Sequence, residues 1–379
     1  MLFYIFTPKV FLNMTNYIKM NKFFITLLLF VAATIAQAQT LIPFNQKNIS
    51  YMGRVEYIEN QCAKIYWPGT SAKINFEGTD AKVILKNESG TVYFYAIIDG
   101  DPQLAKKIKP DTTKTSYVLA TGLPKGKHSV QIFKLTDNTT ITSFYGFELN
   151  KGAQVLKADH PEKKKIEFYG NSITAGHGVE VAVGQNDSGA PEFFNNYLTY
   201  AALTARHYNA QYSCIARSGI GVMLSWFPII MSEMYDRSNP NDPDSKWDFS
   251  KYTPDVVVVN LFQNDSWIIN MPAHEQFKAR FGTTRPSEQK IIESYRDLVS
   301  KIRGKYPKAS IICALGNMDA TRKGSPWPGY IEKAVKGLND SKIYTHFFAY
   351  KDTDGHPKIA EQKAMADDLI DFIDKNIKW

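Results

Sequence analysis

A serine lies two residues after a glycine at the end of a short apolar run, within residues 163–178. Ile166 and Phe168 predict a strand, and Gly170 allows the backbone to turn sharply after it. Ser172 would then lie at the carboxyl edge of a sheet, where open α/β folds bind their ligands. A serine in that place, beside free backbone N–H groups, is suited to act as a nucleophile and to help bind an oxyanion.

Three further segments follow predicted strands or precede the last predicted helix: residues 217–221, 262–265 and 352–357. Because parallel strands end at one edge of their sheet, we expect these segments to meet Ser172 there. A serine nucleophile needs an imidazole to take its proton, preorganised donors for the developing negative charge, and an acceptor that orients the imidazole. Each segment is common on its own, but the four together in this order are much more specific.

The elements that must position these residues begin with a β-rich half at residues 49–149. Residues 72–76 and 128–132 alternate apolar and polar side chains, and residues 81–85 and 91–98 are more continuously apolar. Turn residues such as Gly, Pro, Asn and Asp separate these runs. Short strands at regular spacing without a helical period predict an antiparallel β-sandwich, and more specifically a jelly roll.

From residue 166 onward, strands alternate with helices. The β-branched run at residues 255–261 is typical of a strand buried on both faces, and residues 288–306 carry apolar side chains at helical spacing. Further strands are expected at residues 166–169, 211–216, 310–315 and 343–349, and further helices at 197–208, 330–338 and 359–377. This alternation predicts a parallel sheet covered on both faces. Residues 223–252 do not fit it and are interpreted as an insertion beside the site.

The first 38 residues are interpreted as an upstream extension followed by a signal peptide. Met20-Asn21-Lys22 precedes a mainly apolar run at residues 23–33 and then Ala36-Gln37-Ala38. A basic start, a short hydrophobic core and a small-x-small site are the signature of a secretory signal. The apolar run is short for a membrane span. We therefore predict a start at Met20, cleavage after Ala38, and a secreted or periplasmic protein without stable membrane insertion.

The 379 residues are enough for two domains with separate cores. We place the β-sandwich at residues 39–150, a polar linker at 151–165 and the α/β domain at 166–379. The formal charge of +8 is spread along the chain, and its one basic run, residues 163–165, does not indicate nucleic-acid binding. Burial as small hydrophobes explains the cysteines as well as a disulfide would, and they indicate neither a disulfide framework nor a metal site; they are Cys62, Cys214 and Cys313.

The four segments resemble the sequence blocks of SGNH (GDSL-type) hydrolases. Residues 170–174 match the nucleophile block, Gly219 or Gly221 the glycine block, Asn264 with Asp265 the asparagine block, and His356 the histidine block. By this resemblance Ser172 is the nucleophile and His356 the general base. The oxyanion donors would be the Ser172 backbone N–H, the N–H of one of the two glycines, and the Asn264 side chain.

The β-rich half, with Tyr66-Trp67-Pro68-Gly69 and Ile98-Asp99-Gly100, is similar to the jelly-roll domain that precedes this hydrolase in carbohydrate esterase family 2. The resemblance covers nearly the whole mature chain. It implies a flavodoxin-like α/β/α hydrolase domain that removes acetyl groups from plant polysaccharides and their oligosaccharides. It also implies a serine acyl-enzyme mechanism with no metal ion or organic cofactor.

The residue that orients the imidazole departs from the commonest pattern of these hydrolases, Asp-x-x-His. Position 353 is Thr, Asp354 lies two residues before His356, and Asp352 lies four before it. Family 2 esterases tolerate an Asp at the shorter spacing or a backbone carbonyl, and we select Asp354. In a second departure, Phe262-Gln263 replaces the Gly-Thr of many relatives and is expected to crowd the pocket floor.

Other residues near these blocks are given simpler roles. Asp265 is expected to brace its loop, and His177 to point along the segment that follows Ser172. Among Trp226, Trp267 and Trp327, the best candidate for a platform under a sugar ring is Trp267, because flat aromatic faces stack on sugars. Trp67 is assigned to the sandwich core. The remaining histidines have no supporting partners and are interpreted as structural or surface residues: His128, His160, His207, His274 and His346.

These observations favour a serine acetylesterase that acts on acetylated polysaccharide or oligosaccharide. The nearest alternative is an esterase or lipase of another acyl specificity, although nothing after the leader is long and apolar enough for a lid or a membrane-docking helix. The alternative from another class is a carbohydrate-binding protein with a degenerate hydrolase half. That protein would need one of the four segments to be broken.

Overall fold

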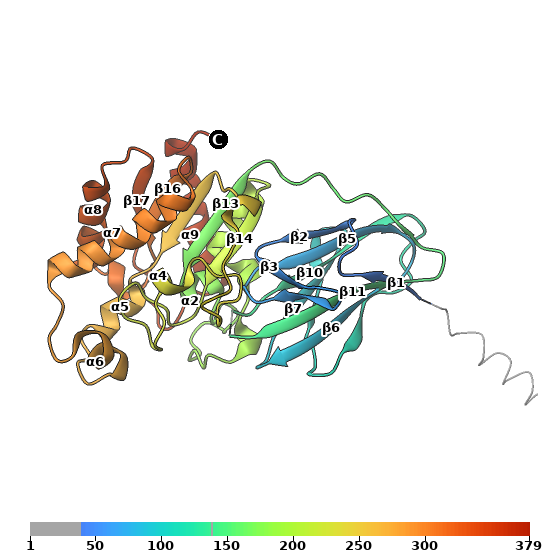
Figure 1. The fold of residues 1–379 in the computed structure, drawn as a ribbon, viewed down its shortest axis with the longest axis horizontal. Coiled ribbons are helices and arrows are strands. Elements are labelled where there is room, and N and C mark those ends of the chain that lie inside the picture. The colour runs from blue at the N-terminus through green and yellow to red at the C-terminus, as the bar shows by residue number, and fades with distance from the viewer. Residues whose placement is uncertain (1–38, 138) are drawn as a thin grey trace, which may run out of the picture.

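The computed structural model describes residues 39–379 with the exception of residue 138. Two antiparallel sheets occupy one end of the molecule, and a parallel sheet with its helices occupies the other (Figure 1). The predicted leader, with its start at Met20 and its cleavage site after Ala38, lies outside the described residues.

Residues 40–155 form the two antiparallel sheets. Their strands are β1 (Thr40–Pro43), β2 (Ile49–Met52), β3 (Val55–Ile58), β4 (Cys62–Ile65), β5 (Ser71–Glu77), β6 (Ala81–Ser89), β7 (Phe94–Ile98), β8 (Asp101–Ile108), β9 (Thr115–Ala120), β10 (Lys127–Lys134), β11 (Ile141–Leu149) and β12 (Gln154–Val155). One sheet has the order β3-β4-β11-β6-β9, with β1 also paired to β11. The other has the order β12-β5-β10-β7-β8, with β2 also paired to β5.

The two sheets face each other across one apolar core. Phe76 of β5, Leu85 of β6 and Phe147 of β11 are among its fully buried members, so both sheets contribute to it. Along β5 the side chains alternate between this core and the outer face, which is the pattern that the sequence predicts at residues 72–76. The predicted succession of antiparallel strands is therefore confirmed.

The second half of the chain forms a five-stranded parallel sheet. Its strands are β13 (Lys165–Gly170), β14 (Gln211–Ala216), β15 (Val256–Asn260), β16 (Ser310–Leu315) and β17 (Ile343–Phe347). Their order is β14-β13-β15-β16-β17, which is the flavodoxin-like order of doubly wound folds. All residues of β15 are buried, as the β-branched run predicts for a strand covered on both faces.

Helices cover both faces of the parallel sheet. The helices are α2 (Ser172–Ala175), α3 (Tyr200–His207), α4 (Met231–Met234), α5 (Gln263–Ile268), α6 (Glu275–Phe281), α7 (Glu288–Lys305), α8 (Trp327–Leu338) and α9 (Ile359–Asn376), with 3₁₀ turns η1 (Pro191–Phe193), η2 (Asn196–Leu198), η3 (Phe249–Lys251) and η4 (Asp319–Thr321). Helices α7 and α8 pack with Val257 and Val259, and α3 and α9 pack with Val256 and Val258. None of the described helices combines the length and apolar character that a membrane span requires.

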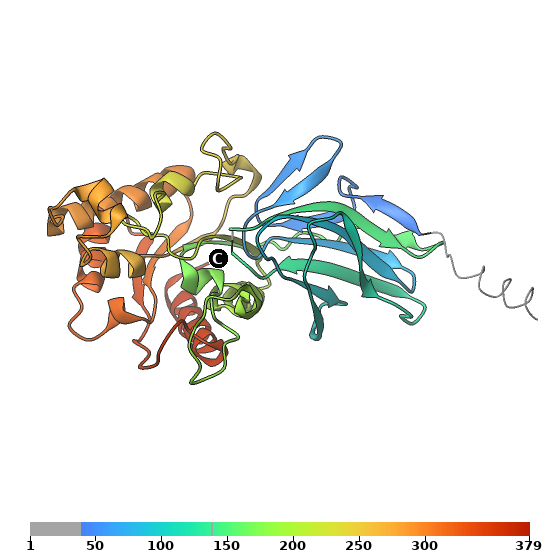
Figure 2. The same ribbon diagram turned by 90° about the horizontal axis from the view of Figure 1, so that it is seen from below.

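A buried arginine joins the two halves of the molecule. Arg54, in the turn between β2 and β3, is fully buried, and its Nη2 lies 3.2 Å from Glu167 Oε1 of β13. The same nitrogen donates to the Tyr169 hydroxyl at 3.1 Å, and Nη1 donates to the carbonyls of Tyr235 and Arg237 at 2.7 and 2.9 Å. Figure 2 shows the antiparallel sheets abutting the parallel-sheet half along this boundary.

Trp67 lies in the same interface, so its assignment to the sandwich core is wrong. Its side chain packs with the apolar cluster that includes residues of α7, and its indole N–H donates to the Ser238 carbonyl at 2.7 Å. Gly69 has a φ of +74°, and an added Cβ would lie 2.3 Å from the ring of Tyr212. The segment Tyr66-Trp67-Pro68-Gly69 thus connects the two halves of the chain.

A buried lysine holds a loop that reaches the carboxyl edge of the parallel sheet. Lys134 Nζ donates to the carbonyls of Tyr66, Asp137 and Thr140, at 2.8 and 2.9 Å for the last two. Burial lowers the pKa of Lys134 to about 7, whereas three carbonyl acceptors favour the ammonium form. Asp137 Oδ2 accepts from the Ser218 backbone N–H at 3.3 Å, so this loop touches the segment that carries the predicted oxyanion glycines.

The three cysteines are buried and unpaired. Burial raises the pKa of Cys214 and that of Cys313 to about 12. These thiols therefore stay protonated and pack as small apolar side chains, which confirms their interpretation from the sequence.

Replacement of Arg54 by Ala is expected to lower the free energy of unfolding by about 3–5 kcal/mol, because it leaves the Glu167 carboxylate buried without its partner. Urea denaturation followed by tryptophan fluorescence measures this change. Lys363→Ala is the control, since it removes an exposed ion pair to Asp367 on α9 and should change the stability little. An Arg54→Ala protein as stable as the native one would show that the interface does not depend on this ion pair.

Candidate active site

Ser172 begins α2 directly after the end of β13. Asn171 caps this short helix, because its Oδ1 accepts from the Ile173 N–H at 3.0 Å. Gly170 is required at the turn, since an added Cβ would lie 2.1 Å from Thr174 Oγ1. Ser172 is 6% exposed, and a residue in the first helical turn has no intrahelical acceptor for its backbone N–H. The serine therefore lies at the carboxyl edge of the sheet, as the sequence predicts.

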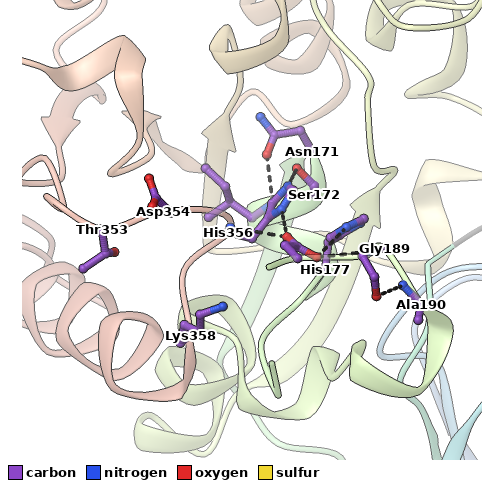
Figure 3. Close-up of polar contacts among 12 residues, drawn as sticks. Asn171, Ser172, His177, Gly189, Ala190, Thr353, Asp354, His356 and Lys358 are labelled. Atoms are coloured by element: carbon purple, nitrogen blue, oxygen red, sulfur yellow. Dashed lines mark hydrogen bonds and ion pairs between the residues drawn. The ribbon is translucent and has the colours of Figure 1, made fainter. Parts of the chain in front are cut away.

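His356 lies in the loop between β17 and α9 and reaches the serine. Its Nε2 is 2.8 Å from Ser172 Oγ (Figure 3). Burial lowers the pKa of His356 below its ordinary value of 6.5, although the hydrogen bond to Asp187 acts in the opposite direction. At neutral pH the imidazole is therefore neutral and can accept the serine proton through Nε2.

Asp187, and not Asp354, contacts the other ring nitrogen of His356. The Nδ1 atom hydrogen-bonds to Asp187 Oδ2, and the His356 backbone N–H donates to the same oxygen at 3.4 Å. Asp352 and Asp354 are both exposed, and no hydrogen bond joins either carboxylate to the imidazole in the part of the chain that the structure describes. The structure thus corrects the selection of Asp354: the loop before α9 bends so that a carboxylate from a different loop reaches the ring.

Two glycines make room for the Asp187 carboxylate. An added Cβ at Gly178, where φ is +65°, would lie 2.7 Å from Oδ2, and one at Gly355, where φ is +72°, would lie 3.2 Å from the Asp187 Cβ. Burial disfavours the charged carboxylate, but hydrogen bonds from His177 and His356 hold the pKa of Asp187 well below its usual range. Asp187 is therefore ionised at any pH at which the imidazole is neutral.

No pattern in the sequence marked Asp187. It lies in the run Asn186-Asp187-Ser188-Gly189, which has the composition of an ordinary polar turn. The only signal was indirect: Thr353 occupies the position from which the acid usually comes.

His177 is a second imidazole at this carboxylate. Its Nε2 lies 3.3 Å from Asp187 Oδ1, and its ring centroid lies 4.2 Å from that of His356. The expectation that His177 points along the following segment is therefore wrong. Each of the three side chains thus has an atom within 4.8 Å of the other two.

The asparagine and glycine segments lie beside each other. Asn264 Nδ2 donates to the Ile220 carbonyl at 2.7 Å, and its Oδ1 accepts from the Trp226 indole at 3.0 Å. An amide nitrogen carries two N–H donors, so one remains for a substrate oxygen. The Gly221 N–H is used within its own loop by Ser225 Oγ at 2.9 Å. The Gly219 N–H has no hydrogen-bond acceptor among the described residues.

Asp265 braces the residues that directly follow the glycine segment, whereas the sequence predicted that it would brace its own loop. Its buried carboxylate accepts three successive backbone N–H groups, from Val222 at 3.0 Å, Met223 at 2.7 Å and Leu224 at 2.9 Å. Burial raises the pKa of Asp265 to about 6, while the three N–H donors favour the carboxylate. The residue holds the loop that presents Gly219.

Phe262 does not crowd the pocket floor, so that expectation is wrong. Its φ of +87° lies in the left-handed region, which is strained for a bulky residue. Its side chain packs against the rings of Tyr295 and Trp327 at centroid distances of 4.8 and 4.9 Å. The unusual backbone conformation therefore turns the ring into the core beneath α7.

The structure links Trp226 more directly than Trp267 to the predicted oxyanion donors. Trp267 is half-buried on α5, and its indole N–H donates to Asp319 Oδ2 at 3.0 Å. Trp226 is 41% exposed, donates to Asn264, and would lie 3.2 Å from a Cβ added at Gly219. An exposed indole next to two candidate donors is suited to contact a bound substrate.

The first half of the chain also contacts the residues on both sides of the Asp187 loop. Lys107 of β8 forms an ion pair with Glu180, and the Tyr95 hydroxyl of β7 lies 3.3 Å from the same carboxylate. Asn195 Nδ2 donates to the Tyr95 hydroxyl at 2.7 Å and to Glu180 at 2.9 Å. Both flanks of the Asp187 loop are therefore tied to the antiparallel sheets.

Comparisons with known proteins identify relatives of this chain. The sequence model described as Carbohydrate esterase 2 N-terminal matches residues 51–158. The cellulase/esterase CelE of Acetivibrio thermocellus is 32% identical over 345 residues, which are 87% of this chain but only 40% of the length of CelE. An acetylxylan esterase / glucomannan deacetylase of Cellvibrio japonicus is 22% identical over 351 residues, 89% of this chain and 91% of its own length.

Solved structures show the same relationship. A family two carbohydrate esterase from Clostridium thermocellum in complex with cellohexaose is 33% identical, with a TM-score of 0.76 over 86% of this chain and 98% of that one. A family two carbohydrate esterase from Cellvibrio japonicus shares the fold at 21% identity, with a TM-score of 0.78 over 89% of this chain and 98% of that one. The chain described here belongs to carbohydrate esterase family 2.

Proposed function

We propose that this protein is a serine esterase that removes O-acetyl groups from plant-type polysaccharides or their oligosaccharides. The observation that carries the proposal is the chain of contacts from Ser172 Oγ to His356 Nε2 at 2.8 Å and from His356 Nδ1 to Asp187. The names of the relatives, a cellulase/esterase and an acetylxylan esterase / glucomannan deacetylase, support the choice of an acetylated carbohydrate.

In the proposed reaction Ser172 Oγ attacks the acetyl carbonyl carbon while His356 Nε2 takes the hydroxyl proton. Asp187 stabilises the imidazolium that forms. The negative oxygen of the tetrahedral intermediate accepts from the N–H groups of Ser172, Gly219 and Asn264. His356 then gives its proton to the departing sugar oxygen. A water molecule then gives a proton to His356 and attacks the acetyl carbon of the acyl-enzyme. The bond from that carbon to Ser172 Oγ breaks, His356 returns the proton to Ser172 Oγ, and acetate leaves. No step uses a metal ion or an organic cofactor.

The substrate surface that we propose includes two tryptophans. Trp226 is exposed and bonded to Asn264, and Trp267 presents part of its ring from α5. Indole faces pack well against the apolar faces of sugar rings. An acetylated sugar held there would bring its ester to Ser172.

The domains that we propose correspond to the antiparallel sheets and to the parallel sheet. We propose a jelly-roll domain at residues 39–150, a linker at 151–165 and an SGNH hydrolase domain at 166–379, supported by the family model at 51–158. Strand β12 lies within the linker and pairs with β5, so the linker's first residues belong structurally to the first domain. The leader pattern in the sequence supports a secreted or periplasmic protein.

Ser172→Ala is expected to reduce kcat by at least about 10³-fold on an aryl acetate and on acetylated xylan, because it removes the attacking oxygen. Acetate release is the measurement, and Ser300→Ala on the exposed side of α7 is the control that should keep native activity. A native protein that binds the polysaccharide but releases no acetate would instead support the carbohydrate-binding alternative. Activity that rises with acyl chain length would support a lipid esterase.

Asp187→Asn is expected to lower kcat by roughly 10²–10⁴-fold, because an amide at this position can hold the imidazole in the wrong tautomer. Asp354→Asn is the matched control and should leave kcat near its native value, since the Asp354 side chain is exposed and does not contact His356. Steady-state kinetics on the aryl acetate compares the two. A larger loss in Asp354→Asn than in Asp187→Asn would contradict the assigned acid.

The kcat/KM of the free enzyme is expected to stay constant through neutral pH and to fall only at acidic pH, with an apparent pKa below 6.5. The reason is that only neutral His356 accepts the serine proton, and burial lowers the pKa of this imidazole. Initial rates between pH 4 and 9, with residual activity checked after each incubation, define the curve. An acidic limb centred above pH 7 would be inconsistent with His356 as the buried base.

A further inference from the structure

One carboxylate in this structure serves two imidazoles. Asp187 Oδ2 contacts Nδ1 of His356, and Asp187 Oδ1 lies 3.3 Å from Nε2 of His177. The two rings are inclined by 32°, with centroids 4.2 Å apart. In a Ser-His-Asp arrangement the second carboxylate oxygen has no required imidazole partner. The role of His177 is therefore not explained by the proposed reaction.

His177 is fixed to the same turn as the nucleophile. Its backbone N–H donates to the Ser172 carbonyl at 3.0 Å, directly after Gly176 ends α2 with a φ of +94°. Its ring also packs on Phe194 at a centroid distance of 4.5 Å. The imidazole of His177 thus has a defined position relative to Ser172.

Asp187, by contrast, lies on a loop with little packing of its own. Residues 182–186 are exposed, and Val183 is 90% exposed. Within the loop the carboxylate accepts only the Gly189 N–H, at 3.2 Å. Such a loop does not by itself fix the position of the carboxylate or of the imidazole paired with it. His177 is attached to the nucleophile's turn, and its Nε2 lies 3.3 Å from Asp187 Oδ1.

The surroundings of His177 differ between its two ring nitrogens. Its Nδ1 is buried and has no hydrogen-bond partner among the described residues, so a proton there would lack an acceptor. An N–H at Nε2, by contrast, faces Asp187 Oδ1 at 3.3 Å. The titratable groups that face it are Asp187 on its own loop and His356 from the loop before α9. Lys351 acts on His356 from that second loop.

We infer that His177 is a positioning residue, which anchors the Asp187 carboxylate and withdraws part of its negative charge from His356. The inference rests on the proposed function, because it concerns the base of that reaction. A carboxylate that accepts from two N–H groups stabilises an imidazolium at either one less than a carboxylate that accepts from one alone. His177 therefore keeps Asp187 in place and at the same time limits the basicity of His356.

Two substitutions distinguish the role of the His177 side-chain N–H from the role of its aromatic ring. His177→Phe keeps an aromatic ring against Phe194 and His356 but removes the donor to Asp187. His177→Gln removes the ring but places an amide N–H near the position of Nε2 and cannot titrate. We expect His177→Phe to lower kcat by about 10-fold or more with little change in KM, because Asp187 stays paired with His356 but, without its anchor, no longer holds that ring in a fixed position relative to Ser172. His177→Gln should recover most of that loss.

The apparent pKa of His356 is a second measurement, and a purely packing role of His177 would leave it unchanged. In His177→Phe the apparent pKa of the acidic limb of kcat/KM should rise by about 0.5–1 unit, since Asp187 then acts on His356 alone. In His177→Gln it should stay near the native value. His207→Gln, at an exposed position on α3, is the control for a His-to-Gln change and should alter neither kcat nor the pH profile.

NMR can monitor the same titration of His356 without relying on catalysis. The His356 imidazole signals of Ser172→Ala protein, with and without His177→Phe, report the shift even if the protein hydrolyses no acetate, so failure of the esterase proposal is distinguishable. If His177→Phe does not fold, NMR of the native protein still tests whether the carboxylate is shared. The ring N–H protons of His177 and of His356 should then each give the signal of a proton that is hydrogen-bonded to Asp187. Unchanged His356 titration in His177→Phe, equal losses in the Phe and Gln variants, or only one such N–H signal would overturn the inference.

Discussion

Charged side chains buried among backbone hydrogen-bond partners hold the catalytic edge together. Apart from Ser172 and Asn264, the proposed catalytic groups are carried by loops, and loops do not fix side chains by themselves. Asp265 accepts from three successive N–H groups at residues 222–224, directly after the glycine segment. Lys134 donates to the carbonyls of Asp137 and Thr140, in the loop that touches Ser218, and to the carbonyl of Tyr66. Buried charges of this kind are costly unless they are fully paired, so the loops that satisfy them have few alternative conformations.

The antiparallel half of the molecule is part of this arrangement. Asp137 bonds to the glycine loop, while Lys107 and Tyr95 hold the segment before the Asp187 loop through Glu180. Two of the loops that complete the site are thus attached to the first half of the chain. The parallel sheet supplies the serine, and the antiparallel sheets keep the groups around it in register, so the two halves act as one catalytic unit.

The sequence was most informative where secondary structure alone decides position. The segments of Ser172, Asn264 and His356 could be placed together because each lies near the end of a strand or the start of a helix, and parallel strands end at a common edge. The roles of the three residues came from the resemblance to SGNH hydrolases. Asp187 could not be predicted in this way, because its place depends on how a polar loop folds back between two glycines. Trp67 was misplaced because its partner, Ser238, is distant in the chain, and an interface between halves leaves no periodic pattern.

The absence of disulfides in this chain has a practical consequence. Cys62, Cys214 and Cys313 are buried and unpaired, so no covalent cross-link contributes to the stability of the fold. Folding of the described residues then depends on their apolar clusters and on the interface between the two halves, and no cysteine pairing has to form. A single new cysteine at an exposed position would be the preferred target of a thiol-reactive dye, since the native thiols are shielded from reagents in solution.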